Sequence, residues 1–175
     1  SIPILGARGF GYSLARQFGH AMVPTRAALV PFTLSGRPLE IWADLAGLAC
    51  EVELNLPQKS FRGALLFTHR GLSGPAVLQI SSYWHPGQEL LFNWLPDADV
   101  TAELLELKKQ GGGADLSAYL GKRLPRRLAQ NLFAQLAESR PLSALRDQDL
   151  RDIAQRLHAW AVLPSGTEGY RTAEV

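Results

Sequence analysis

The sequence of 175 residues is poor in the residue types that build disulfide bonds, metal sites and membrane spans. Its only cysteine, Cys50, can form no internal disulfide and no thiolate zinc site, which agrees with a reducing compartment. Its four histidines follow no metal-ligand spacing, so we expect no metal. No apolar run is long enough to cross a membrane. These absences predict a cytoplasmic protein without a membrane partner.

Motifs for nucleotide binding and for serine hydrolysis are incomplete. In residues 9–14, GFGYSL, Leu14 stands where the dinucleotide-binding fingerprint needs its third glycine. In residues 71–75, GLSGP, Pro75 stands where the nucleophile elbow of a hydrolase needs glycine. The chain therefore carries neither of these sites in complete form.

Charge is nearly balanced overall but uneven along the chain. The net charge of +2 is too small to indicate a polyanionic partner. Residues 115–140, however, hold three more positive than negative side chains, the positive ones being Lys122, Arg123, Arg126, Arg127 and Arg140. Such a pattern is typical of a solvated helix face, and the alternative is a surface that binds nucleic acid or an acidic protein.

Hydrophobic periodicity predicts a leading helix and then a strand-rich block. The leading helix covers residues 9–19, with Gly19 as a left-handed cap. Strands are predicted over residues 28–34, 48–56, 61–68 and 88–95, and a buried helix over residues 75–83.

From residue 97 onward the period is helical. Asp99 and Asp115 are expected to cap two helices, and further helices are predicted over residues 125–139 and 147–160. The last of these should bury Leu157 and Trp160. The run over residues 170–175 then alternates like a strand.

These patterns predict an α+β fold with a β-rich, barrel-like part and a small helical part. We expect four segments: a leading segment and helix in residues 1–22, the β-rich part in 23–96, the helical part in 97–162 and a returning strand in 163–175. Because the chain starts without methionine and stops inside a strand-like run, we expect it to be a piece of a longer polypeptide.

The run FTHRGLSGPAVLQISSYW, residues 67–84, joins a strand end to a helix start. Ser73 is expected to cap that helix. The same junction could present free N–H groups, with a nearby cation, to a carboxylate or phosphate. The candidate substrate-binding residues are therefore His69, Arg70, Ser73 and Gly74.

This run resembles the BaiN-like (YhiN-like) family of FAD-dependent oxidoreductases, as do SIPILGARGFGYSLARQFGH at residues 1–20 and GTEGYRTAEV at residues 166–175. The resemblance implies an insert domain, placed between the two halves of a flavin-binding domain that this chain lacks. It implies an NAD(P)H-linked dehydrogenase or reductase of a small-molecule substrate, in which this part covers the flavin. We expect FAD in the longer polypeptide, and neither bound FAD nor activity in this chain alone.

The resemblance also implies that both ends of the chain approach the flavin. Arg171, Thr172 and Glu174 would then be catalytic residues near the reaction centre. The residues expected to approach the cofactor are Ser1, Pro3, Gly6, Gly9 and Gly11.

Two alternatives stay open. One is a binding module that contacts nucleic acid or an acidic protein through the basic residues 122–127. Aromatic side chains are not interleaved with these cations, so we do not expect nucleic acid among the partners. The other is a purely structural insert.

Overall fold

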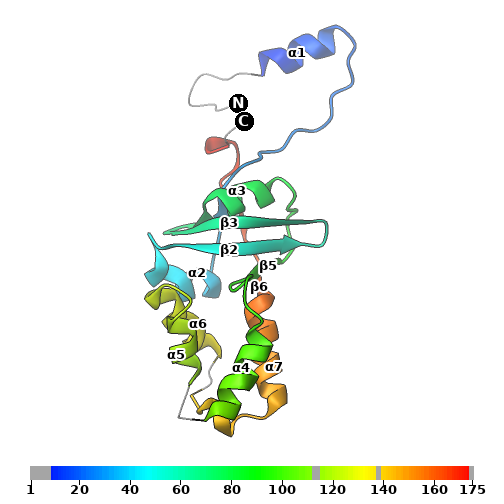
Figure 1. Cartoon of the computed structure of the whole chain (residues 1–175). Helices are drawn as coiled ribbons and strands as arrows, with labels where there is room; N and C mark the ends of the chain where they lie inside the picture. Colours follow the sequence, from blue (N-terminus) through cyan, green and yellow to red (C-terminus); the bar gives the residue numbers. More distant parts are fainter. Residues whose placement is uncertain (1–8, 112–114, 137–138, 174–175) are drawn as a thin grey trace.

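The computed structural model describes residues 9–111, 115–136 and 139–173 of the chain. A sheet occupies the middle of the molecule, a group of helices lies on one side of it, and helix α1 (Phe10–Gln17) stands apart on the other side (Figure 1). The predicted α+β fold, with a β-rich part and a helical part, is confirmed. The exact borders of the four segments stay a prediction. Within the described ranges, no helix combines the length and the apolar character needed to cross a bilayer.

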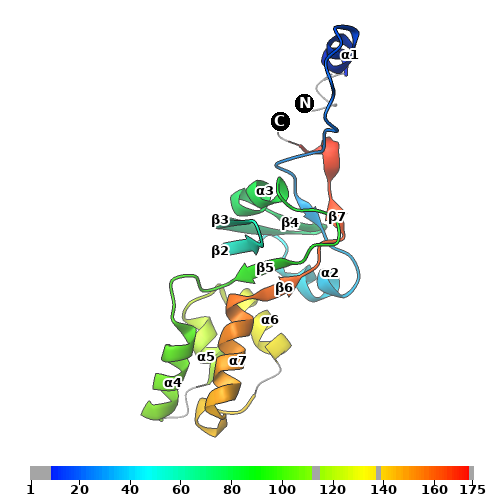
Figure 2. The ribbon, with the colours of Figure 1, turned by 90° about the vertical axis from the view of Figure 1, so that its right-hand side faces the viewer.

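The sheet is antiparallel and curled. In the described part of the chain it has seven strands: β1 (Phe32–Thr33), β2 (Ala49–Leu56), β3 (Lys59–Thr68), β4 (Gly71–Ser73), β5 (Leu90–Asn93), β6 (Trp160–Val162) and β7 (Gly166–Thr167). Their order is β6-β5-β2-β3-β4-β1-β7, so β6 and β7 form opposite edges. Only residues 163–165 separate these two strands, and such a link spans at most about 14 Å. The two edges must therefore approach each other, which gives the sheet its barrel-like form (Figure 2).

Strand β2 shows how the sequence builds this sheet. Val52, Leu54 and Leu56 alternate along it and are buried, whereas the side chains between them face outward. β3 pairs with β2 over the whole length of β2. The strands predicted over residues 48–56 and 61–68 are confirmed.

Trp42 closes the core of the β-rich part. It ends helix α2 (Arg37–Trp42), which leads into the short η2 (Ala43–Leu45). Its ring meets Phe67, Phe92 and Trp94 edge-on, with centroid distances of 5.4, 5.7 and 6.1 Å. The buried indole N–H of Trp42 has no hydrogen-bond partner among the described residues.

The helical part is an insertion between two neighbouring strands. β5 ends at Asn93 and β6 begins at Trp160, and these strands pair with each other. The helices between them are α4 (Val100–Gln110), α5 (Leu116–Gly121), α6 (Arg126–Leu136), η3 (Leu142–Ala144) and α7 (Asp147–His158). Both predicted caps are confirmed: Asp99 accepts from the N–H of Ala102 at 3.0 Å and Asp115 from that of Ala118 at 2.7 Å.

Helix α1 forms as predicted but has no buried residue. Gly19, at φ 78°, ends it, and the N–H of His20 reaches the carbonyl of Ala15 at 3.0 Å. Phe10 and Phe18 are 74% and 72% exposed, so its apolar stripe covers nothing in the described part of the chain.

Two predicted elements were wrong at their ends. Helix α7 stops at His158, and Trp160 lies in strand β6 opposite Phe92, half-buried rather than in the core of a helix. The strand predicted over residues 28–34 shrinks to β1, because Leu29 adopts φ 51° and Pro31 follows it.

The junction around helix α3 (Pro75–Ser81) also differs from the prediction. Ser73 lies in β4 opposite Leu66 and does not cap the helix. Gly74 is the N-cap instead, at φ 99°, where a Cβ atom would lie 2.6 Å from the carbonyl oxygen of Ala64. Only glycine fits between the strand and the helix, so no side chain can cap at this position.

The last stretch of the chain is a turn rather than a strand. Residues Gly169–Arg171 form the short 3₁₀ helix η4, which contradicts the strand predicted from residue 170 over its described part. Gly169, at φ 64°, provides the left-handed backbone with which this turn starts.

Candidate functional site

Two of the predicted substrate-binding residues form a tight turn between β3 and β4. Thr68 and Gly71 pair across it, so His69 and Arg70 are its two central residues. The hydroxyl of Thr68 accepts from the N–H groups of Arg70 and Gly71 at 3.3 and 3.1 Å. Both side chains of the turn are exposed. Ser73 and Gly74 lie at the other end of β4, so the four residues do not converge through hydrogen bonds on one point.

Arg70 instead shares a carboxylate with Arg171. Its Nη1 lies 3.6 Å from Oε1 of Glu168, and Nη2 of Arg171 lies 3.5 Å from Oε2 of the same residue. The Glu168 side chain is only 15% exposed, and its N–H donates to the carbonyl of Pro31 at 3.0 Å. The buried hydroxyl of Thr172 has no partner in the part of the chain that the structure describes. Glu168 is not among the residues predicted from the sequence, although its i,i+3 spacing to Arg171 is a local signal for such a pair.

Two of the residues predicted to approach a cofactor, Gly9 and Gly11, lie in the described part of the chain, and they form no cradle for FAD. Gly9 and Gly11 belong to the start of the exposed helix α1, and a Cβ atom on Gly11 would meet nothing within 4 Å. Ser1, Pro3 and Gly6 lie outside the described residues, as does Glu174. The described residues therefore do not fit an FAD site, and flavin binding stays a prediction for the longer polypeptide. In the described ranges no group of side chains could hold a metal ion.

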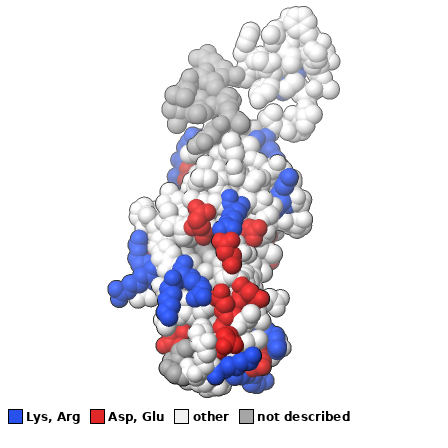
Figure 3. All heavy atoms as spheres, in the orientation of Figure 1, with Lys and Arg blue, Asp and Glu red and all other residues white. Residues whose placement is uncertain are grey.

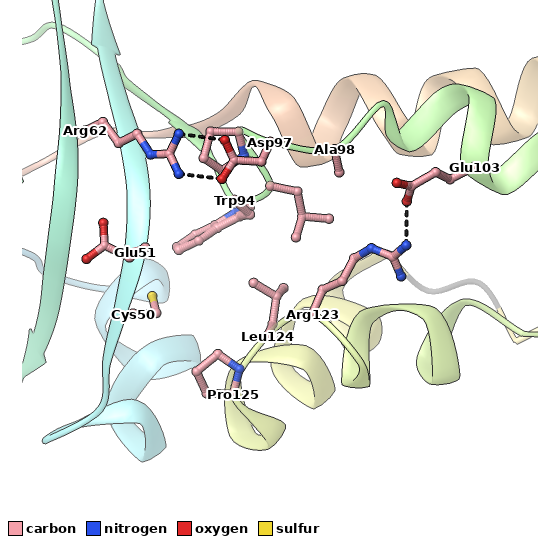
Figure 4. Close-up of a pocket in the computed structure, with 12 residues that line it drawn as sticks. Cys50, Glu51, Arg62, Trp94, Asp97, Ala98, Glu103, Arg123, Leu124 and Pro125 are labelled. Atoms are coloured by element: carbon pink, nitrogen blue, oxygen red, sulfur yellow. Dashed lines mark hydrogen bonds and ion pairs between the residues drawn. The ribbon is translucent and has the colours of Figure 1, made fainter.

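A cleft of about 480 Å³ lies where the β-rich part meets the helical part (Figure 4). Its floor is apolar and includes Trp94, Leu95 and Leu124, each less than 10% exposed. β2 contributes Cys50 and Glu51 to its wall. The size is that of a small-ligand pocket.

Two ion pairs stand on either side of this cleft. Arg62 on β3 holds Asp97 through both guanidinium nitrogens, with Nη1 at 2.7 Å from Oδ1, and this pairing lowers the pKa of Asp97. Across the cleft, Nη2 of Arg123 lies 2.7 Å from Oε2 of Glu103 (Figure 4). The cleft therefore offers both donors and acceptors above an apolar floor.

Tyr119 fixes the second ion pair in place. Its hydroxyl donates to Glu103 at 2.6 Å, and the guanidinium of Arg123 lies 4.0 Å above its ring. Burial, followed by the hydrogen bond to Glu103, raises the pKa of Tyr119, so the phenol stays protonated. Arg123 is thus held as a flat, oriented cation at the edge of the cleft.

The side chain of Cys50, in the wall of the cleft, is a protonated thiol at neutral pH. Burial, with the nearby charge of Glu51, raises its pKa to about 11. A thiol of this kind is a poor nucleophile at neutral pH.

The basic residues between α5 and α6 split into two groups. Arg123 pairs with Glu103, and Arg127 donates to the carbonyl of Asp44 at 2.9 Å. Lys122 and Arg126 are exposed and have no ion-pair or hydrogen-bond partner among the described residues. Figure 3 shows basic side chains on the α5–α6 side of the molecule and acidic ones toward α4.

Sequence reasoning found the cations of this turn but not the cleft beside them. The pairs Arg62–Asp97 and Arg123–Glu103 join residues on separate elements, and no local spacing signals such pairs. Arg62–Asp97 forms where the segment after β5 passes β3, and Arg123–Glu103 forms where the α5–α6 turn packs beside α4.

The chain matches the family model described as HI0933-like protein barrel and H2TH domain over residues 26–175. Over its whole length it is 48% identical to the ribosomal RNA dihydrouridine synthase of Escherichia coli (strain K12). It is 40% identical to the ribosomal RNA dihydrouridine synthase of Haemophilus influenzae (strain ATCC 51907 / DSM 11121 / KW20 / Rd). The chain spans 44% of the length of each of these relatives.

Proposed function

Because the chain belongs to the HI0933-like barrel and H2TH domain family, we propose that it is the RNA-facing part of a dihydrouridine synthase that acts on ribosomal RNA. The observation that carries this proposal is the 48% identity, along the whole chain, to a relative of that name. The proposal replaces the small-molecule substrate expected from the sequence by an RNA substrate. It favours the alternative in which the basic residues 122–127 contact nucleic acid.

The α5–α6 turn has the chemistry that an RNA backbone requires. Lys122 and Arg126 are exposed and carry no competing partner in the described ranges, so both charges are available to phosphates. Arg127, tied to the carbonyl of Asp44, holds the turn against η2. The turn is therefore a fixed platform with two free cations.

Dihydrouridine formation adds a hydride and a proton across the C5=C6 double bond of uridine. We propose FAD, reduced by NAD(P)H, as the redox group of the longer polypeptide. The part that we propose for the described residues is to hold and orient the RNA. Arg70 and Arg171, joined through Glu168, are candidates for contacts near the reacting nucleotide.

The test compares two double charge reversals in the full-length protein. Lys122→Glu with Arg126→Glu should weaken binding of single-stranded ribosomal RNA fragments about tenfold or more. It should also lower the slope of log K against log salt by roughly 0.7 for each lost phosphate contact. Lys109→Glu with Arg151→Glu changes the total charge equally on α4 and α7, and should have a smaller effect.

Mass spectrometry of the RNA provides the second measurement. Wild-type enzyme should add two hydrogens to a uridine, and the first double variant should do so more slowly at limiting RNA. Equal losses for both double variants would refute a specific role of the turn. A wild-type protein that neither binds RNA nor forms dihydrouridine would refute the proposed function itself.

A further inference from the structure

The α5–α6 turn presents different residues to its two sides. Lys122 and Arg126 carry the free charges, whereas Arg123, Leu124 and Pro125 between them line the cleft. A strand whose phosphates lie on the two cations would therefore pass along the rim of the cleft. The cleft is then the nearest pocket for a base that extends from that strand.

The cleft matches a nucleobase in shape and polarity. A base has apolar faces and a polar edge, and the cleft has an apolar floor between two ion pairs (Figure 4). Its volume of about 480 Å³ lies within the range of small-ligand pockets. Arg123 is already stacked on Tyr119 and lines the cleft, so its guanidinium plane is oriented before a ligand arrives. Arginine planes and aromatic rings are the usual stacking partners of unpaired bases.

The carboxylates on the two sides of the cleft are already engaged, Asp97 by Arg62 and Glu103 by Arg123. Glu51 also lines the cleft, but its carboxylate points away from Trp94 and Leu124 (Figure 4). The contacts that the cleft offers to a base are therefore its apolar floor and the guanidinium plane of Arg123.

We infer that the cleft between the β-rich and helical parts binds one unpaired nucleobase of the RNA, packed on its apolar floor and stacked near Arg123. This inference rests on the proposed function and adds to it a subsite separate from the Arg70–Glu168–Arg171 cluster. The cluster includes η4, which lies on the α1 side of the sheet (Figure 1), whereas the lining of the cleft comes from β2, β3 and the helical part. The base in the cleft is therefore a different nucleotide from the reacting uridine, and its binding fixes the register of the strand.

The test uses the full-length protein and a protein-free ribosomal RNA strand that carries photoreactive thiouridine at its unpaired positions. Wild-type protein should give RNA crosslinks to the peptides that contain residues 94–98 and 123–125. Ala98→Trp, which fills the cleft, should remove these crosslinks and weaken binding about tenfold, the effect of losing one stacked base. Ala134→Trp, on an exposed face of α6, is the matched control and should change neither.

A milder variant protects the test from misfolding. Arg123→Lys keeps the charge but loses the planar guanidinium, so it should melt like wild type and weaken binding about fivefold, whereas Arg37→Lys on α2 should bind as wild type. RNA binding at wild-type strength by Ala98→Trp and Arg123→Lys, or crosslinks confined to other peptides, would overturn the base subsite and leave the proposed function intact. Failure of wild type to bind RNA would overturn both.

Discussion

Arg70 and Arg171, far apart in the sequence, contact opposite oxygens of one carboxylate, that of Glu168. Arg70 belongs to the β3–β4 turn and Arg171 to η4, so the bridge ties the last described segment of the chain to the sheet. Both arginine side chains are more than half exposed, at 61% and 54%. Pairs with such exposure contribute little to folding stability, so their value lies in orienting two cations.

Kinetics of single variants should separate the roles of the two arginines. In the full-length enzyme, Arg70→Ala should raise KM for RNA, because it removes a contact made before and during the reaction. Arg171→Ala should lower kcat more severely if it orients the reacting nucleotide. Bound flavin, measured by absorbance, should be the same in both variants. Wild-type values of kcat and KM in both variants would indicate that the two arginines have only a structural role.

Gly74 should tolerate no side chain. In Gly74→Ala the new Cβ atom would lie 2.6 Å from the oxygen of Ala64 and 2.9 Å from the nitrogen of Leu66. We expect a loss of about 3 kcal/mol or more in the free energy of unfolding, from backbone strain and steric overlap together. Gly87→Ala is the matched control, since Gly87 has φ 88° with no atom within 4 Å, and it should lose only about 1 kcal/mol. Urea titration of both variants measures the difference, and equal losses would contradict the predicted steric overlap.

The N-cap of α3 at Gly74 is a detail that the sequence could not predict. Alternation in β2 and the carboxylates of Asp99 and Asp115 are local signals, and they predicted strand β2 and the starts of α4 and α5 correctly. Ser73 was assigned as a cap because it precedes a helix, but the backbone turn at Gly74 depends on contact with Ala64 on the neighbouring strand. Contacts between distant residues decide such details.

In the candidate site, too, some residues could be predicted from local sequence and others depend on contacts between distant residues. The cations of the α5–α6 turn and Arg70 could be selected from local sequence, whereas Arg171 was selected only through the family resemblance. The i,i+3 spacing of Glu168 to Arg171 is a local signal, but its contact with Arg70 arises only when η4 packs near the β3–β4 turn. The cleft depends on the packing of two subdomains, which no periodicity encodes.

Cys50 should react slowly with alkylating reagents and only at high pH. Its pKa is raised to about 11, because burial disfavours the thiolate. Alkylation of the folded protein, followed by mass spectrometry, should therefore accelerate up to about pH 11. In denaturant the rate should level off at a lower pH, near the ordinary thiol range. A folded-state midpoint in that ordinary range would contradict the burial argument.

The raised pKa of Cys50 also affects stability at high pH. The folded state holds the thiol proton more tightly than the unfolded state, so the stabilising contribution is complete below the ordinary value of 9.0. It should be lost as the pH rises from there toward about 11. Cys50→Ser should remove this dependence, which chemical denaturation at several pH values would detect as a flatter curve over that window.

Leu157 should couple the helical part to the sheet. Its side chain is fully buried on α7, and its carbonyl accepts from the N–H of Trp94 at 3.0 Å. Leu157→Ala keeps that backbone bond but leaves a cavity, and should cost about 2 to 5 kcal/mol. Gln155→Ala, on the exposed face of the same helix, should change stability by less than about 0.5 kcal/mol. Thermal unfolding followed by circular dichroism and by tryptophan fluorescence gives the decisive comparison. If the two parts fold as one unit, both signals of Leu157→Ala should shift together to lower temperature, whereas an unshifted melt would place this face of α7 outside the core.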